Sequence, residues 1–455
     1  MKPLCREARR RSRQRQSALR WAAVFLAVAS SASASPEDIF GYGPRSQSMA
    51  GLGGLSTRSF DAAYLNPASL GGIRERELGF GFQGGVFRLH VDDRNYPTDG
   101  AHGLMVGAST PIPFGGVLRD RFGLAMAIYT PTDVLARGKI LYPEREQFPL
   151  YPDRTQSIAI RMGLGAKFGP VSLGVGVAAL AQLLATVVVA ADATGKVGSR
   201  VEGQLVATYA PTFGASVQTK LSPRLELTNG LVFRGPLDAR FEVLIDATKL
   251  SSLSFPLLNI SGLAQYDPLQ VAWEANLRIE EKWNIAAGVT FKNWSGYPGP
   301  FEATVRCAEG ESDCGALKAP AFSFSNTFVP RVAAEWTHTD ERGLTTKLRG
   351  GYFFEPSPLP TELPSQEAHT EGALRTLPVR VFDGHRHVFA FGGGIRFGKK
   401  VPVFLDGSFQ WHLTPSRTFE LAPGSVSNDG SPLPSKTAVT GGNAFVISWM
   451  GGIAF

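Results

Sequence analysis

The sequence predicts an all-β fold, a transmembrane antiparallel β-barrel of about 14 strands that is plugged by an N-terminal hatch. Three observations support this prediction. The chain begins with the pattern of an export signal, most of the remainder alternates between apolar and polar residues, and the last strand ends in a phenylalanine. We expect residues 1–34 to form the signal peptide, 35–75 the hatch and 76–455 the barrel.

The first residues have the pattern of a secretory signal peptide. Residues 1–20 contain 8 Lys and Arg and one acid, whereas residues 21–34, "WAAVFLAVASSASA", carry no charge and end in a small-x-small site at Ala32 to Ala34. Such an order is typical of a cleavable signal. The alternative is a membrane anchor, but the apolar run of 14 residues is shorter than the about 20 that span a bilayer.

Removal of the signal changes the charge of the protein. The whole chain has a formal charge of +7, but its 46 basic and 39 acidic residues become 38 and 38 without residues 1–34. A balanced charge gives no support to nucleic-acid binding. We therefore expect no nucleic-acid partner.

Two cysteines remain after Cys5 leaves with the signal. Cys307 and Cys314, in "CAEGESDC", enclose a short polar segment. In an oxidising compartment this spacing predicts a disulfide. A metal site is the alternative, although no histidine lies near these residues in the sequence.

Apolar and polar residues alternate along much of the chain. In "LQVAWEANLRI", every second residue from Leu269 to Ile279 is apolar. Glu274 and Arg278 lie on the other face. Such a period of two over about ten residues indicates a strand with one apolar face. Segments of this kind lie near 77–90, 101–110, 121–130, 156–168, 171–190, 204–219, 224–235, 268–280, 282–294, 330–338, 343–354, 386–397, 402–413 and 442–455.

The connections between these segments differ in length in a regular way. Short connections follow even-numbered strands, at 169–170, 220–223, 281, 339–342 and 398–401. Long connections follow most odd-numbered strands, at 131–155, 236–267, 295–329, 355–385 and 414–441. Tight turns at one end and long loops at the other are expected of an outer-membrane barrel.

A soluble, secreted all-β protein is the alternative, because its strands also alternate, with the apolar face turned inward. Two features favour the membrane. The polar faces carry mixed charges such as Glu274 and Lys347, which suit a wet lumen. Aromatic residues also lie near predicted strand ends, where a girdle would form. They are Tyr129, Trp283, Tyr352 and Trp411.

The C-terminal strand resembles the recognition signal of bacterial outer-membrane proteins. Counting back in twos from the end, its apolar face consists of Phe455, Ile453, Gly451, Trp449, Ile447 and Phe445. This resemblance implies insertion by the barrel assembly machinery into the bacterial outer membrane, among its lipid and lipopolysaccharide. We expect a monomer.

The segment 39–73 precedes the first strand and is nearly uncharged. It contains "FDAAYLNPASL" at 60–70, in which Pro67 fixes a bend, and glycines at 51, 53 and 54 permit tight reversals. We predict that it folds inside the barrel as a plug, with Phe60, Asn66, Pro67 and Ala68 at its centre. The alternative is a flexible linker that follows the signal.

Several motifs resemble those of the FadL-type outer-membrane transporters of long-chain fatty acids and other hydrophobic compounds. They are Asn66-Pro67-Ala68 within "DAAYLNPASL", "KWNIAAGVTFKNWSGY" at 282–297, and "LRGGYFFEPSPLPTELP" at 348–364 with "DGHRHVFAFGGGIRF" at 383–397. The resemblance implies passive, hatch-gated transport of hydrophobic small molecules, such as long-chain fatty acids or aromatic hydrocarbons. It also implies capture by outer loops, passage to an interior site and sideways release near the third strand. The sequence does not place that opening.

Two predicted outer regions are apolar where water-facing residues are expected. Such patches usually mark a binding site, so we predict ligand contacts there. The residues are Leu253, Phe255, Leu257, Leu258 and Ile260 in loop 236–267, with Leu180, Leu183 and Leu184 at the end of the fifth strand. The alternative is that these loops pack on one another as a cap.

The sequence gives little support to an enzyme. It lacks a Gly-x-Ser-x-Gly elbow, and its seven histidines, including His385 and His387, show no metal-ligand spacing. We expect no catalytic residue, metal or cofactor. Two further alternatives stay open, a general diffusion pore and a hatch-bearing barrel that serves as scaffold or shuttle in a secretion or surface-attachment complex.

Overall fold

The computed structural model describes a chain with several internal gaps. The described residues are 36–133, 145–152, 158–191, 197–249, 258–297, 299, 302–305, 322–370, 373–398, 400–423 and 436–455. The predicted signal peptide and the predicted disulfide between Cys307 and Cys314 lie outside them.

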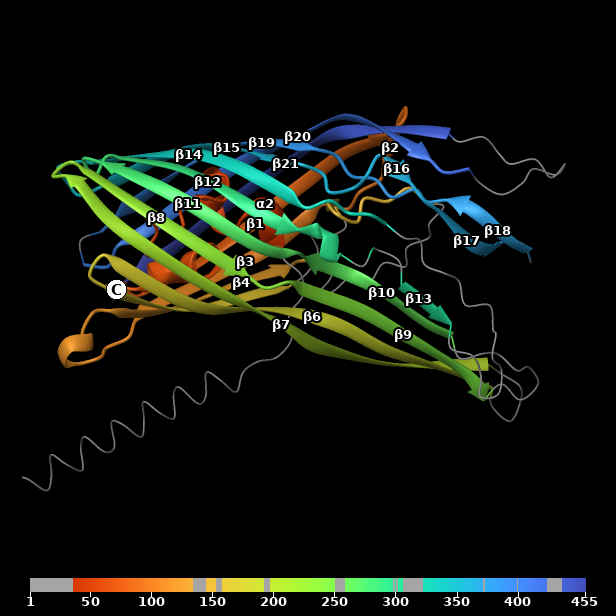
Figure 1. The fold of residues 1–455 in the computed structure, drawn as a ribbon. Coiled ribbons are helices and arrows are strands. Elements are labelled where there is room, and N and C mark those ends of the chain that lie inside the picture. The colour runs from red at the N-terminus through yellow and green to blue at the C-terminus, as the bar shows by residue number, and fades with distance from the viewer. Residues whose placement is uncertain are drawn as a thin grey trace, which may run out of the picture.

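Fourteen antiparallel strands form a closed barrel, which confirms the predicted fold class (Figure 1). In order around the ring they are β1 (Glu77–Val91), β3 (Ala101–Pro111), β4 (Phe122–Pro131), β5 (Ala159–Phe168), β6 (Val171–Ala191), β7 (Val197–Ser222), β8 (Leu225–Arg234), β11 (Leu269–Ile279), β12 (Trp283–Asn293), β14 (Thr327–Thr339), β15 (Thr345–Glu355), β19 (Arg386–Phe397), β20 (Val403–Leu421) and β21 (Lys436–Ala454). The ring closes where β1 pairs with β21, from Glu77 opposite Ala454 to Val91 opposite Thr440. Each predicted segment overlaps one of these strands.

Further strands lie in the long connections. They are β2 (Arg94–Tyr96), β9 (Leu237–Lys249), β10 (Leu258–Asp267), β13 (Glu302–Val305), β16 (Glu362–Leu363), and a hairpin of β17 (Ser365–Thr370) and β18 (Ala373–Pro378). β9 pairs in parallel with β6, beginning at Leu183 opposite Phe241, beyond the point where β5 stops pairing with β6. The backbone groups that β5 leaves unpaired on β6 are thereby satisfied. Much of the predicted loop 236–267 is therefore strand.

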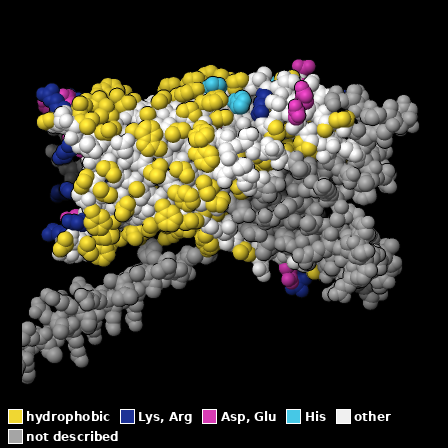
Figure 2. Space-filling model, in the orientation of Figure 1, with side chains coloured by type: hydrophobic (Ala, Val, Ile, Leu, Met, Phe, Trp, Pro, Cys, Tyr) yellow, Lys and Arg dark blue, Asp and Glu magenta, His cyan; other side chains and the backbone are white. Residues whose placement is uncertain are grey.

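The two faces of the barrel wall differ as the alternation predicts. Along β1, Leu78 and Phe80 point outward and are exposed, whereas Phe87 and Leu89 point inward and are buried. Apolar side chains spread over the outer wall, and Lys and Arg gather at the end that carries the short connections (Figure 2). This distribution is that of a barrel with a lipid-facing band. Of the predicted girdle residues, Tyr129 is an exception, since it is buried and faces the lumen.

The C-terminal strand turns its predicted apolar face outward. Ile447, Trp449, Ile453 and Phe455 are exposed on the outer wall, and Phe445 is partly exposed. Of the residues between them, Val446, Ser448, Met450 and Ala454 are buried. The role of this face in assembly stays a prediction.

The N-terminal segment lies inside the ring of strands, where its helices appear in red and orange in Figure 1. It contains the helices α2 (Pro36–Phe40), α3 (Gly43–Ser48) and α4 (Ala62–Leu65), and the 3-10 helix η1 (Pro67–Leu70). Two more 3-10 turns, η2 (Gly116–Leu118) and η4 (Trp294–Gly296), lie in connections. Among the described residues, no helix is both long enough and apolar enough to cross a bilayer. We call residues 36–73 the plug.

Candidate functional site: the plug and the lumen around it

The predicted centre of the plug is a compact turn. Asn66 has an extended backbone, and its side-chain Oδ1 accepts a hydrogen bond from the Ala68 N–H at 3.0 Å. Pro67 then begins η1, a position where a missing N–H is tolerated. Asn66, Pro67, Ala68 and Phe60 are all buried. The four predicted plug residues are therefore enclosed together with most of the segment, although Arg58 is exposed.

The barrel wall beside this turn is made of glycine. Gly165 on β5 is the register partner of Gly174 on β6, which in turn is the partner of Gly214 on β7. A Cβ at Gly174 would lie 2.2 Å from the Pro67 carbonyl carbon, and one at Gly214 would lie 2.1 Å from Asn66 Oδ1. No side chain fits at such distances. This glycine row, defined as these three residues, lets the plug backbone rest directly on the wall.

The start of the plug is held by buried ion pairs. Glu37 lies 3.1 Å from Arg161 of β5, measured between Oε2 and Nε. Asp38 accepts a hydrogen bond from Gln270 at 2.6 Å and lies 3.1 Å from the Nζ of Lys292 on β12. Sequence reasoning missed these contacts, although two adjacent acids shortly after the predicted signal peptide could have pointed to them.

These charges continue across the lumen. Lys292 Nζ lies 2.8 Å from Glu355 on β15, and Glu355 lies 3.8 Å from Arg386 on β19. On the other side, Arg161 also pairs with Asp267 at 3.5 Å. All of these side chains are at least nine-tenths buried, so each charge has lost its contact with water. Only the oppositely charged partners offset the free-energy cost of that loss.

Burial also affects acids within the plug. Burial raises the pKa of Glu37, and the Arg161 guanidinium only partly offsets this. The pKa of Asp61 is raised for the same reason, with Arg45 and the Thr57 hydroxyl acting in the opposite direction. Both acids therefore hold a proton more readily in the enclosed plug than they would in water.

The middle of the plug wraps around a carboxylate of the wall. The backbone N–H groups of Gly53, Gly54 and Leu55 point at Glu274 of β11, with nitrogen–oxygen distances of 3.1, 3.2 and 3.4 Å. Gly53 has a φ of 93°, which a residue with a side chain rarely adopts. Glu274, predicted to face the lumen, thus anchors the reversal that the glycines permit.

One plug side chain reaches the seam between the second and third barrel strands. The Tyr42 hydroxyl lies 2.7 Å from the carbonyl oxygen of Val106 on β3 and 3.3 Å from that of Ile128 on β4. Val106 and Ile128 are register partners, and β4 pairs with β3 and with β5 without a register shift. Inward-facing Ala127 is fully buried. Over the described residues, the third strand is therefore paired on both edges and sealed from inside.

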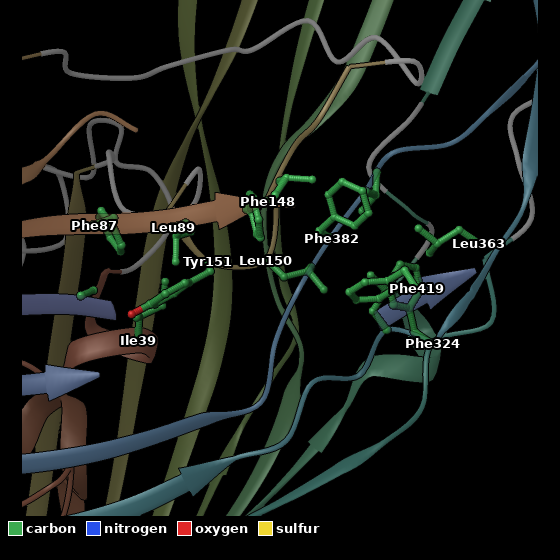
Figure 3. Close-up of a cluster of buried hydrophobic side chains, with 14 of the residues drawn as sticks. Ile39, Phe87, Leu89, Phe148, Leu150, Tyr151, Phe324, Leu363, Phe382 and Phe419 are labelled. Atoms are coloured by element: carbon green, nitrogen blue, oxygen red, sulfur yellow. The ribbon is translucent and has the colours of Figure 1, made fainter. Parts of the chain in front are cut away.

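The lumen at the long-connection end is filled by apolar side chains (Figure 3). We call this group the apolar cluster, and it joins α2 of the plug to β1, β20, β21 and the long connections. Its larger members include Ile39, Phe40, Phe87, Leu89, Phe148, Leu150, Tyr151, Phe324, Leu363, Phe382 and Phe419. Sequence reasoning did not single out these residues, because they are scattered over the whole chain.

The predicted ligand-binding residues do not all meet in one place. Leu180 is buried in a separate small cluster with Ala178, Ala210 and Leu237. Leu183 and Leu184 lie on β6 opposite β9, and Leu258 and Ile260 lie on β10. Leu253, Phe255 and Leu257 fall outside the described residues. Their role in binding stays a prediction.

The short-connection end of the lumen is polar instead. A cavity of about 640 Å³ opens there between the plug and the wall, with Arg45, Lys347, Arg349 and Asp406 in its lining. Arg349 pairs with Glu335 at 2.7 Å and with Asp406 at 2.5 Å. The plug therefore separates an apolar compartment from a charged one. In the described part of the chain, no group of three or more His, Cys, Asp or Glu is arranged to hold a metal.

Comparison with known proteins gives matches in structure alone. No protein-family model and no curated protein matches the sequence. A Pseudomonas aeruginosa FadL homologue superposes with a TM-score of 0.53 at 15% identity, over 90% of this chain and 98% of that one. The P. putida toluene transporter TodX gives a TM-score of 0.49 at 13% identity, with 92% and 99% covered. The Ralstonia pickettii toluene transporter TbuX gives 0.47 at 11%, with 91% and 98% covered. The first of these superpositions shows that the chain has the fold of a FadL homologue.

Proposed function

We propose that this protein is an outer-membrane channel that passes hydrophobic small molecules passively, with the plug as a gated hatch. Long-chain fatty acids and aromatic hydrocarbons are the substrates proposed from the sequence resemblance. The observation that carries the proposal is the division of the lumen by residues 36–73, with the apolar cluster on one side and the charged cavity on the other. An apolar molecule is favoured in the first compartment and water in the second.

The proposed route starts at the long connections, which face the cell exterior in this orientation. A ligand leaves water for the apolar cluster and reaches Ile39 and Phe40 of α2. It passes further only when α2 moves, which requires the ion pairs of Glu37 and Asp38 to separate. The plug thus excludes ions and polar solutes while an apolar ligand can displace its first helix.

The proposal also covers the export, membrane insertion and location of the protein. We infer export with a cleavable signal over residues 1–34, insertion by the barrel assembly machinery, and a final location among outer-membrane lipid and lipopolysaccharide. A general diffusion pore would need a lumen free of the plug, whereas residues such as Met49, Ala62 and Leu70 are fully buried in it. No contact of the described residues specifically favours a scaffold or shuttle role.

Deletion of residues 39–73 tests this function. The truncated barrel should conduct ions in planar bilayers and sensitise cells to large antibiotics, while its selective uptake of an apolar substrate falls. Deletion of the β17–β18 hairpin, which pairs only with itself among the described strands, is the matched control. Unchanged conductance and uptake in a correctly assembled plug deletion would make the segment a linker and remove the mechanism.

A further inference from the structure

The connection between β3 and β4 is the longest at the short-connection end of the barrel. It comprises residues 112–121, whereas the other connections at this end have at most five residues. We call it the β3–β4 turn, and it is the orange loop at the lower left of Figure 1. A Cβ added at Gly115 or Gly116, near its tip, would meet no atom within 4 Å. The tip therefore stands clear of the other described residues.

The β3–β4 turn exposes large apolar side chains. Val117 is 80% exposed, Phe114 44% and Leu118 42%. The backbone around them is ordered, since Gly116–Leu118 form η2 and the Arg119 N–H donates to the Gly116 carbonyl at 3.2 Å. Contact of these side chains with water is unfavourable, and a cluster of exposed apolar residues usually marks a surface that something else covers.

The apolar tip is continuous with the lipid-facing wall. The Phe114 ring packs edge-on against Phe122 of β4, with centroids 5.1 Å apart, and Phe122 packs in the same way against Phe168 of β5, at 6.1 Å. Phe122 and Phe168 face outward, because successive strand residues alternate and their neighbours face the lumen. Of these neighbours, Gly123 lies against the plug and Lys167 lines the charged cavity. One apolar surface thus runs from the outer wall onto the turn.

Two arginines border this apolar surface. The Arg121 guanidinium carbon lies 5.6 Å from the centroid of the Phe168 ring. Arg119 has a side chain that is 79% exposed, and its contact with Asp120 at 3.6 Å is exposed as well, so that contact contributes little. Apolar side chains edged by cations are typical of a segment that lies in the interface of an anionic bilayer.

We propose that the β3–β4 turn inserts its apolar tip into the periplasmic leaflet and that Arg119 and Arg121 bind the phosphates of anionic phospholipids there. The short connections face the periplasm in the orientation given above, so the lipid that covers the wall at this end belongs to that leaflet. A guanidinium holds a phosphate through two parallel hydrogen bonds. Phosphatidylglycerol is preferred over phosphatidylethanolamine, because the amine of the latter cancels the charge of its phosphate.

Lipid is a better partner for this surface than a periplasmic protein. The tip is joined through Phe114 to rings of the lipid-facing wall, and a protein that covered the tip would have to displace lipid from Phe122 and Phe168 as well. The inference is independent of the cargo of the channel, since it requires only that the outer wall meets lipid.

Fluorescence quenching by lipid tests the insertion. An environment-sensitive fluorophore is attached to Val117→Cys in a Cys307→Ser, Cys314→Ser background, and the protein is placed in nanodiscs with brominated or unmodified acyl chains. Glu341→Cys is the matched control, because this residue is exposed in the short connection between β14 and β15. Bromine should quench the label at position 117 severalfold more than the label at position 341. Phe114→Ser should reduce the quenching at position 117.

The same label tests the arginines. In nanodiscs that contain both phospholipids, with bromine on only one of them, quenching at position 117 measures the local abundance of that lipid. A basic residue at an anionic surface contributes about fivefold in affinity, so Arg119→Gln with Arg121→Gln should lower the preference for phosphatidylglycerol by at least about this factor. Arg224→Gln with Arg342→Gln removes two arginines from other short connections and should leave the preference unchanged.

The outcomes decide each half of the inference. Equal quenching at positions 117 and 341 would show that the tip lies in water and would refute the insertion. Strong quenching at position 117 with the same lipid preference in both double variants would leave an apolar anchor and refute the phosphate site. Heat-modifiable mobility should be retained in every variant, because all of the changes lie in exposed connections. None of these measurements involves transport, so their failure would leave the proposed function standing.

Discussion

Asn66 and Gly214 approach so closely that the wall residue cannot carry a side chain, since a Cβ at position 214 would lie 2.1 Å from Asn66 Oδ1. Asn66 also caps η1 through the same oxygen. The position of the plug turn and the absence of a side chain on β7 therefore depend on each other.

Gly214→Val should displace the Asn66–Ala68 turn while the barrel still forms, because Val is well suited to a strand. The expected result is a rise in ion conductance in planar bilayers, with heat-modifiable mobility retained. Gly203→Val on the same strand is the control, because a Cβ there meets no atom within 4 Å. Equal conductance in the two variants would contradict a wall fitted to the plug.

Lys292→Met should release α2 from the wall. It leaves Asp38 and Glu355 buried without their shared cation, and removal of one partner from a buried pair typically destabilises by about 3–5 kcal/mol. Limited proteolysis should then cut within residues 36–48 of the folded barrel. Arg224→Met is the comparison, since its pair with Glu280 is exposed and worth about 0–1 kcal/mol. Full protection in Lys292→Met would show that these ion pairs do not hold the plug.

Acidification should hold the plug more firmly in place. Burial raises the pKa of both Glu37 and Asp61, so the enclosed plug binds more protons than a released one. Its stability therefore rises as the pH falls from neutrality toward the ordinary carboxyl values, and declines again as the pH rises through the shifted values. Channel openings should be rarer at pH 5 than at pH 7.5. Asp61→Asn, which cannot ionise, should reduce this difference. A greater opening rate in acid would contradict the inference that protonation stabilises the enclosed plug.

Deletion of Phe455 should impair assembly, because the exposed terminal ring completes the apolar face of β21. Cell fractionation should then find less heat-modifiable barrel in the outer membrane and more unassembled protein in the periplasm. Phe455→Tyr keeps the aromatic ring and should assemble. Wild-type levels after deletion would show that this residue is not part of the signal.

Cys307 and Cys314 are predicted to form a disulfide, which would stabilise their short loop by about 2–3 kcal/mol. Alkylation of the purified protein should modify neither thiol before reduction and both after it. Free labelling without a reductant would exclude the bond.

The alternation of residues was sufficient to predict the barrel strands, because lipid and lumen impose opposite demands on successive residues. It missed β9 and β10, since these strands lie in long connections that the pattern assigns to loops. The plug was predicted because Pro67 and the nearby glycines have conformational preferences of their own. Its ion pairs were not, because Asp38 and Lys292 meet only through the register of the barrel. The glycine row was hidden for the same reason among 51 glycines.

The closed ring places a condition on the order in which the molecule is built. The plug directly precedes β1, and the seam between β1 and β21, the last described strand in sequence order, closes the ring. Once that seam is zipped, buried residues such as Met49 and Leu70 have no side entrance through the paired strands. The N-terminal segment therefore has to be inside before this seam closes or to enter afterwards through an open end of the lumen, because entry through the wall is possible only before closure.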